Sequence, residues 1–274
     1  MSNPGLLTRL AMEPPFRVLV RLAMRPLRLS AETRALWELS ARPAYLLGVL
    51  TAAKQARRQD VGAISVVEFG VAGGDGLVAL QEESAAVERE TGVAIRVFGF
   101  DMGAGLPDFI GDYRDHPDMW RPGDYAMDEA RLRRRLNDRT TLILGNVADT
   151  VTHFFADHDA PPIGFVSFDL DLYSSTRDAL RLLSLPDKRM LWHVPVYFDD
   201  IGFLGNHRLA GELLAIDEFN RESHGVVIDE WYGLRSERPF PERAFLSKMR
   251  VAHDLRAISS VVLGRPHAQL PLSR

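Results

Sequence analysis

Short apolar runs of strand length alternate with segments of helical spacing along most of this 274-residue chain. Strands that alternate with helices in this way predict a doubly wound α/β fold with a mainly parallel, seven-stranded sheet. We expect the strands at residues 64–68, 95–100, 141–144, 163–168, 191–198, 226–231 and 248–253. We expect the helices between them at residues 77–90, 127–136, 150–155, 174–183 and 209–219.

The first 60 residues have a helical pattern without the unbroken apolar core of a signal peptide. Five arginines interrupt the apolar residues between Met1 and Ser30. Residues 31–57 continue in helical spacing, with Ser30 as an N-cap and Pro43 as a break. We expect residues 1–60 to be a helical extension that packs on its own or a neighbouring subunit, and residues 61–274 to form one domain. The alternative is a basic amphipathic helix at a membrane surface.

The overall charge and the cysteine count exclude several classes of protein. A formal net charge of −4 gives no basic field, so we expect no nucleic-acid partner. The absence of cysteine excludes disulfides, thiolate metal sites and cysteine nucleophiles, and it fits the reducing cytoplasm. No apolar run reaches the roughly 18 to 20 residues that a transmembrane helix needs, so we expect no membrane insertion.

A long polar segment rich in Gly, Pro and Asp follows the second predicted strand, at residues 103–128. Loops of this length inside a domain are usually functional or disordered, and the aromatic residues here argue against disorder. We predict a lid over a site, in which Tyr113, Arg114 and Trp120 shape a pocket for an acceptor molecule. An exposed lid without any role in acceptor binding is the alternative.

A glycine-rich turn joins the first predicted strand to the helix that follows it, in Glu68-Phe-Gly-Val-Ala-Gly-Gly-Asp-Gly76. Glycines there let a ligand approach the backbone closely. The dinucleotide fingerprint fails, because Ala72 and Asp75 occupy its third and sixth positions, which argues against a nicotinamide dehydrogenase. Asp101 ends the next strand, where a carboxylate holds the ribose of a bound cofactor. A turn without a ligand is the alternative interpretation.

Two acidic pairs follow two later apolar runs: Asp169 with Asp171, and Asp199 with Asp200. In open α/β sheets, ligands bind beyond the carboxyl ends of the strands, so the two pairs are expected to meet at one edge. Oxygen ligands without cysteine or clustered histidine favour Mg²⁺, Mn²⁺ or Ca²⁺ over zinc. Either pair alone could instead cap a helix or make a turn.

Four stretches occur in a fixed order along the chain: Glu68-Phe-Gly-Val-Ala-Gly-Gly74, Gly99-Phe-Asp-Met-Gly-Ala-Gly-Leu-Pro107, Asp169-Leu-Asp-Leu-Tyr-Ser-Ser-Thr176 and Phe198-Asp-Asp200. Taken together, they resemble the macrocin O-methyltransferase family of metal-dependent sugar O-methyltransferases. The resemblance covers roughly residues 65–220. The glycine turn departs from the family at Ala72 and Gly73, and residues 108–128 have no close counterpart.

The resemblance implies a Rossmann-like class I methyltransferase fold, S-adenosylmethionine as methyl donor, and Mg²⁺ (or Mn²⁺) as activating ion. By position, it implies that Asp171 is the general base. The metal ligands would be Asp169, Asp199 and Asp200. The cofactor would be bound by Glu68, Gly70, Val71, Gly74, Asp101, Asn146, Val147 and Asp169.

These observations together give one functional hypothesis and two alternatives. The hypothesis is a cytoplasmic O-methyltransferase that methylates a hydroxyl of a sugar or glycosylated small molecule. The first alternative is a metal-binding, hydroxylase-associated protein of the same fold. The second is a cofactor-binding interaction protein without turnover. In each case we expect a homo-oligomer formed through the N-terminal helices.

Overall fold

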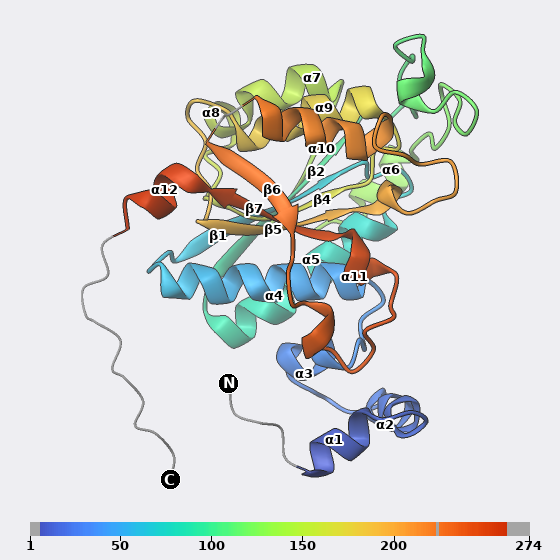
Figure 1. The fold of residues 1–274 in the computed structure, drawn as a ribbon. Helices are drawn as coiled ribbons and strands as arrows, with labels where there is room; N and C mark the ends of the chain where they lie inside the picture. The colour runs from blue at the N-terminus through green and yellow to red at the C-terminus, as the bar shows by residue number, and fades with distance from the viewer. Residues whose placement is uncertain (1–5, 223–224, 262–274) are drawn as a thin grey trace.

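The computed structural model describes residues 6–222 and 225–261 of the chain (Figure 1). Its sheet has seven strands in the order β3-β2-β1-β4-β5-β7-β6. The strands are β1 (Ala63–Phe69), β2 (Ala94–Asp101), β3 (Thr140–Leu144), β4 (Ile163–Phe168), β5 (His193–Phe198), β6 (Val226–Glu230) and β7 (Met249–Asp254). Strand β7 runs antiparallel to both of its neighbours, and the other pairings are parallel. The predicted doubly wound, mainly parallel sheet is therefore confirmed.

Helices cover both faces of the sheet, with α4 and α5 on one side and α7, α9 and α10 on the other (Figure 1). The α-helices are α1 (Leu6–Met12), α2 (Phe16–Met24), α3 (Ala31–Leu36), α4 (Pro43–Arg58), α5 (Asp75–Thr91), α6 (Glu129–Arg133), α7 (Val147–Thr150), α8 (Phe154–His158), α9 (Tyr173–Leu180), α10 (Gly211–Arg221), α11 (Phe245–Lys248) and α12 (Leu255–Ser259). Short 3-10 turns are η1 (Tyr113–Asp115), η2 (Val151–His153), η3 (Arg181–Leu183), η4 (Asp199–Ile201) and η5 (Arg235–Glu237).

The N-terminal helices divide into an outer part and a part that belongs to the core. Ser30 caps α3 by accepting a hydrogen bond from the Thr33 amide, and Pro43 is the first residue of α4, as the sequence predicted. Helix α4 lies against the sheet, and ten of its residues are buried. Residues 1–5 of the predicted extension and 262–274 of the predicted domain lie outside the described residues.

Helices α1 and α2 keep large apolar side chains exposed, including Leu7, Leu19 and Leu22. Arg17 and Arg21 hold α2 against the C-terminal segment, because both guanidinium groups lie 5.5 Å from the ring centre of Phe240. The predicted subunit contact through these helices stays a prediction. Across the described residues, no helix combines the length and the apolar character required to cross a bilayer.

Four phenylalanines form a row across the sheet at the carboxyl ends of its central strands. The ring centres of Phe69 and Phe100 are 4.7 Å apart, those of Phe69 and Phe168 are 5.4 Å apart, and those of Phe168 and Phe198 are 4.7 Å apart. The same residues are register partners in β2, β1, β4 and β5. This phenylalanine row therefore puts the residue that follows each phenylalanine at one edge of the sheet.

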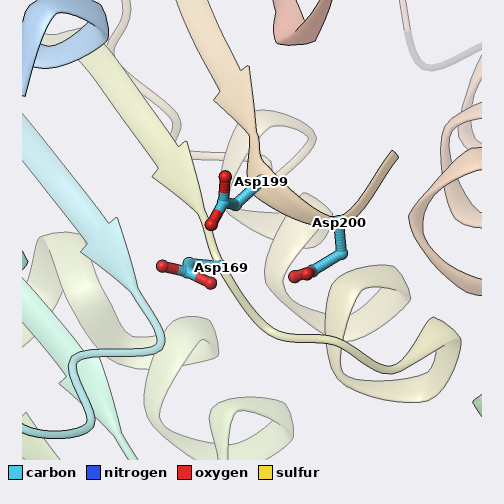
Figure 2. A group of neighbouring side chains, drawn as sticks. All are labelled: Asp169, Asp199 and Asp200. Atoms are coloured by element: carbon cyan, nitrogen blue, oxygen red, sulfur yellow. The ribbon is translucent and has the colours of Figure 1, made fainter. Parts of the chain in front are cut away.

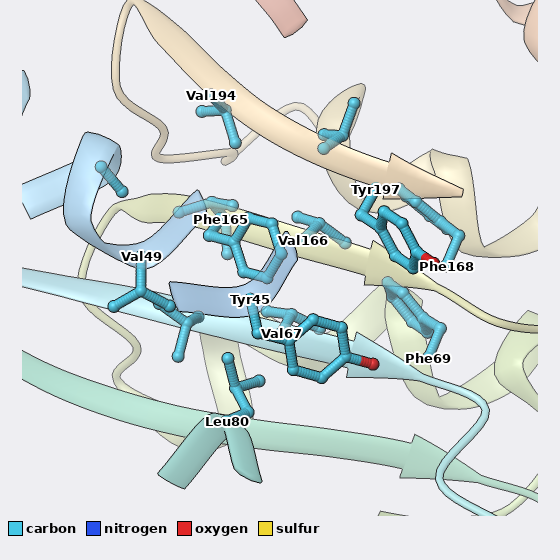
Figure 3. Close-up of a cluster of buried hydrophobic side chains, with 14 of the residues drawn as sticks. Tyr45, Val49, Val67, Phe69, Leu80, Phe165, Val166, Phe168, Val194 and Tyr197 are labelled. Atoms are coloured by element: carbon cyan, nitrogen blue, oxygen red, sulfur yellow. The ribbon is translucent and has the colours of Figure 1, made fainter. Parts of the chain in front are cut away.

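Tyr45 connects helix α4 to the same core. Its ring makes edge contacts with Phe165 and Tyr197, at centre distances of 6.0 and 6.1 Å. Figure 3 shows the Tyr45 hydroxyl directed toward the carboxyl ends of the strands, beside Phe69. Helix α4, which contains none of the sequence motifs, thus places Tyr45 at the edge of the sheet where the acidic residues lie.

Gly70 allows the end of β1 to approach the backbone of Asp169, and we expect Gly70→Ala to destabilise the protein. Its φ of +84° is left-handed, and an added Cβ would lie 1.7 Å from the Asp169 carbonyl oxygen. Backbone strain and overlap together predict a loss of about 3 kcal/mol or more in the free energy of unfolding. Urea denaturation measures this loss. The control is Gly62→Ala, whose Cβ would meet nothing within 4 Å; an equal loss in both variants would contradict the prediction.

Candidate active site

A cavity of about 440 Å³ opens beyond the carboxyl ends of β1, β2, β4 and β5. Every residue that the sequence analysis assigned to the metal, the cofactor or catalysis lines it. These are Glu68, Gly70, Val71, Gly74, Asp101, Asn146, Val147, Asp169, Asp171, Asp199 and Asp200. The structure therefore brings together side chains that are up to 132 positions apart in the chain, from Glu68 to Asp200.

Three of the aspartates form a compact cluster at the ends of β4 and β5. One carboxylate oxygen from each of Asp169, Asp199 and Asp200 lies within 4.8 Å of the other two. Figure 2 shows the three side chains converging between the ends of the two strands. The cluster forms because β4 pairs with β5 and both end at the phenylalanine row.

Hydrogen bonds fix the orientation of the second acidic pair. The Asp199 carboxylate accepts from the Tyr197 hydroxyl at 2.6 Å and from Lys248 Nζ at 2.7 Å. Asp200 accepts from the backbone amide of Asp171 at 3.1 Å, and its own amide donates to the buried Glu212 at 3.0 Å. Neighbouring groups thus hold Asp199 and Asp200 in place, and Lys248 brings a positive charge to Asp199.

Burial and mutual repulsion shift the ionisation of this cluster. Burial, followed by the negative charge of Asp200, raises the pKa of Asp169 to about 7 and that of Asp171 to about 8. Burial and then Asp199 raise the pKa of Asp200 to about 6. At Asp199, burial acts in the same direction, but the hydrogen bonds from Lys248 and Tyr197 outweigh it and lower the pKa.

The donor set of the cluster fits a hard divalent cation. Its ligands are all carboxylate oxygens, which Mg²⁺ and Mn²⁺ prefer. Three acidic side chains that repel one another ionise more readily when a cation lies among them. Asp169, Asp199 and Asp200 are therefore suited to hold such an ion, with Asp171 beside them.

Glu68 lies buried beneath the start of helix α5. One carboxyl oxygen, Oε1, accepts a hydrogen bond from Tyr45 at 2.6 Å, and the Tyr45 hydroxyl in turn accepts from Ser167. The other oxygen, Oε2, is buried without a partner among the described residues. Burial raises the pKa of Glu68 to about 8. Gly76 is required here, since a Cβ would lie 2.1 Å from Oε1.

Asp101 joins the glycine turn to the start of the lid segment. Its carboxylate accepts from the backbone amides of Ala72 at 2.8 Å and Gly103 at 2.6 Å. Each oxygen keeps a second lone pair for a ligand hydroxyl. Asn146 caps α7 by accepting from the Ala148 amide at 2.9 Å, and it lines the cavity from the end of β3.

The cavity fits S-adenosylmethionine in volume and in chemistry. Its volume lies within the range of about 300–1,000 Å³ that is typical of small-molecule sites. The unpartnered oxygen of Glu68 suits a cationic group, and Asp101 suits a pair of ribose hydroxyls. The glycine turn, with Gly70, Gly73, Gly74 and Gly76, also lines the cavity and lets a ligand approach its backbone closely.

The lid segment is anchored to the rest of the domain by Asp115. This fully buried carboxylate accepts from the Ser174 amide at 2.8 Å, from the Ser174 hydroxyl at 2.9 Å and from the Ile110 amide at 2.9 Å. Trp120 lines the cavity, and Tyr125 lines it beside Trp120, with ring centres 6.2 Å apart. The acceptor role expected of Trp120 stays a prediction.

Tyr113 and Arg114, the other predicted acceptor residues, lie elsewhere in the structure and are not among the residues that line the cavity. Arg114 forms an ion pair with Asp112 at 2.9 Å and stacks over Tyr173. Tyr113 lies beside His207, at a ring distance of 6.3 Å. Both side chains therefore pack the lid segment against its surroundings.

Sequence reasoning missed several residues of the site. Arg42 and Tyr125 line the cavity, and Lys248, Tyr45 and Glu212 bond directly to residues that line it. Tyr45 and Arg42 come from the start of α4, and Lys248 comes from α11. No local pattern marks these residues, because their roles depend on how distant elements pack.

Solved structures of methyltransferases resemble this fold. CalS11, a calicheamicin methyltransferase, aligns with a TM-score of 0.51 and 21% identity over 92% of this chain and 98% of that chain. Apo CalS11, described as a TDP-rhamnose 3'-O-methyltransferase, aligns with a TM-score of 0.44 and 19% identity over 92% and 96% of the two chains. The O-methyltransferase NovP aligns with a TM-score of 0.49 and 18% identity over 75% and 91%. No protein-family model matches the chain, and no curated protein matches it.

The strand order and the likeness to CalS11 together show the Rossmann-like fold of class I methyltransferases. The predicted fold class, a Rossmann-like class I methyltransferase fold, is therefore confirmed.

We expect the metal-free protein to lose stability as the pH rises from about 5 to 7. A carboxyl group whose pKa is raised on folding holds a proton that the unfolded chain has released, so rising pH favours unfolding between the two pKa values. For Asp169 this window runs from 3.8 to about 7. Asp169→Asn should make the slope shallower by up to about 1.4 kcal/mol per pH unit.

Urea unfolding in EDTA at several pH values measures this slope. The matched control is Asp187→Asn, at an exposed turn position, which should keep the wild-type slope. A wild-type slope in Asp169→Asn would show that Asp169 ionises normally.

Proposed function

We propose that this chain is an S-adenosylmethionine-dependent O-methyltransferase that uses Mg²⁺ or Mn²⁺ and methylates a hydroxyl of a sugar or glycosylated small molecule. The observation that carries the proposal is a single cavity in which the cluster of Asp169, Asp199 and Asp200 adjoins the glycine turn and Glu68. Methyl transfer needs one place for the methyl donor and an adjacent place for an acceptor bound to a cation. The glycine turn with Glu68 offers the first place, and the aspartate cluster offers the second.

The donor half of the cavity is formed by β1, β2 and the turn that follows β1. S-adenosylmethionine, when bound, supplies a methyl group on a positively charged sulfur. Glu68 offers an unpartnered buried oxygen to a cationic group. Asp101 holds the glycine turn in place by accepting a hydrogen bond from the backbone amide of Ala72. Because Gly70 brings the turn against Asp169, the donor half and the acidic cluster are in direct backbone contact.

The acceptor half is formed by the acidic cluster and the lid segment. A divalent cation, when bound, supplies the charge that favours ionisation of a nearby hydroxyl. Asp169, Asp199 and Asp200 would hold it, and Lys248 and Tyr197 keep Asp199 in place. Holding the two reactants in fixed orientation is the main source of rate enhancement that this geometry offers.

Asp171 is suited to take the proton of the acceptor hydroxyl. Asp171 lines the cavity and is only 8% exposed. It is not one of the three aspartates whose oxygens form the compact cluster. Burial, followed by the charge of Asp200, raises the pKa of Asp171 to about 8. A base with a pKa near the working pH accepts a proton efficiently.

Two aromatic residues of the lid segment support a sugar as the acceptor. Trp120 and Tyr125 line the cavity with aromatic surface, which suits the apolar face of a sugar ring. CalS11, which has the same fold, is a calicheamicin methyltransferase, and this supports a natural-product acceptor.

We expect Mg²⁺ to stabilise the wild-type protein and not the Asp200→Asn variant. A ligand at ten to one hundred times its Kd stabilises the folded state by about 1–3 kcal/mol. Removing one of three carboxylate ligands should abolish most of this gain at pH 8. Thermal melting with Mg²⁺ and with EDTA measures it. The control is Asp75→Asn, which lines the cavity but is largely exposed and pairs with Arg135.

An Mg²⁺ shift that persists unchanged in Asp200→Asn would exclude the cluster as the metal site. A missing shift in the wild type would exclude metal binding altogether.

Asp171→Asn should keep cofactor binding and lose turnover. The amide has the same shape but cannot accept the hydroxyl proton, so kcat should fall by about 10²- to 10⁴-fold. Methyl transfer from labelled S-adenosylmethionine to a panel of sugars and nucleotide sugars measures turnover, and the product mass must rise by one methyl group. Calorimetric titration with S-adenosylhomocysteine should give a Kd within about twofold of the wild type. Normal turnover in this variant would remove Asp171 as the base.

A further inference from the structure

The charges around the cavity are strongly unequal. Among the described residues that line it, Arg42 alone carries a permanent positive charge, against eight carboxyl side chains. The acidic residues are Glu68, Asp75, Asp101, Asp124, Asp169, Asp171, Asp199 and Asp200. A ligand that carries an anionic group therefore finds one side chain in the cavity wall that attracts it.

Arg42 is positioned by the start of helix α4. It is the N-cap residue, its amide donates to Ser40 Oγ at 3.0 Å, and Pro43 follows as the first helical residue. Its guanidinium carbon lies 5.7 Å from the ring centre of Tyr45, and the Tyr45 hydroxyl donates to Glu68. Arg42 thus lies at the Glu68 end of the cavity, which is the donor half.

The guanidinium group of Arg42 forms no hydrogen bond or ion pair with any described residue. The neighbouring cation Lys248, in contrast, is bound to Asp199. Burial opposes ionisation at Arg42, but the acidic groups of Tyr45, Glu68 and Asp169 nearby act in the other direction and raise its pKa above the usual value. Arg42 therefore stays charged while its five N–H donors remain available.

We propose that Arg42 binds the α-carboxylate of S-adenosylmethionine, opposite Glu68, whose unpartnered Oε2 faces the α-ammonium group. This inference rests on the proposed function and assigns the amino-acid end of its donor. Arg42 offers the positive charge that a carboxylate requires, and Glu68 offers a free acceptor oxygen to an ammonium group. Both side chains contact Tyr45, Arg42 by stacking over its ring and Glu68 by a hydrogen bond. A guanidinium matches a carboxylate with two parallel hydrogen bonds, which a lysine cannot reproduce.

A thermodynamic cycle with two ligands tests this assignment. The first ligand is S-adenosylhomocysteine, and the second is its decarboxylated analogue, 5'-deoxy-5'-(3-aminopropylthio)adenosine, which keeps the ammonium group and lacks only the carboxylate. Calorimetry in EDTA measures both Kd values for the wild type, Arg42→Met and Arg42→Lys. The control is Arg58→Met, at the exposed other end of α4.

We expect Arg42→Met to weaken S-adenosylhomocysteine binding by about 10- to 100-fold and to leave the analogue within about twofold. Arg42→Lys should lie between wild type and Arg42→Met, and Arg58→Met should match the wild type. In the wild type, the analogue should bind about 10- to 100-fold more weakly than S-adenosylhomocysteine, and this result does not depend on the folding of any variant.

Two results would overturn the assignment while leaving the proposed function intact. One is equal affinity of the wild type for both ligands, which would mean that nothing in the cavity recognises the carboxylate. The other is an equal loss of both ligands in Arg42→Met, which would mean that Arg42 supports the shape of the pocket or serves an anionic acceptor. Failure of the wild type to bind either ligand would overturn the proposed function and this inference together.

Discussion

The repulsion among carboxylates gathered in a partly buried site at the ends of β4 and β5 is the constraint on which the rest of the site depends. Burial makes each charge costly, and proximity makes every further charge more so. The structure offsets this repulsion in three ways: Lys248 binds Asp199, raised pKa values keep protons on Asp169 and Asp171, and backbone amides donate to Asp200. A ligand that brings positive charge would relieve this repulsion, which is the observation behind the proposed metal site.

The phenylalanine row explains why the fold and the acidic cluster could be predicted from the sequence. Phe69, Phe100, Phe168 and Phe198 each end an apolar run, and a glycine or aspartate lies within two residues. Burial aligns the rings in register, so the polar residues after them must share one edge of the sheet. Local pattern and topology agree here, because parallel strands in a doubly wound sheet end on the same side.

The residues that sequence reasoning missed or placed differently are those whose partners depend on long-range packing. Tyr45 and Lys248 contribute single side chains from helices at opposite ends of the chain, and neither helix has a motif at that position. Arg114 is a residue type that often binds polar ligands. Here its guanidinium group donates a hydrogen bond to Asp112, two positions earlier in the chain. In a lid segment whose regular structure is one short 3-10 turn among the described residues, composition alone does not determine which side chains face the cavity.

The charge imbalance of the cavity also bears on where the functional domain begins. A boundary near residue 60 follows the composition, yet it separates the sheet from α4, which supplies both Tyr45 and Arg42. The strand ends and the glycine turn contribute acids and bare backbone to the cavity wall, and they contribute no basic side chain. A domain cut before β1 would keep the carboxylates and lose their one permanent counter-charge in that wall. Helix α4 therefore belongs to the site, together with the residue that caps its start.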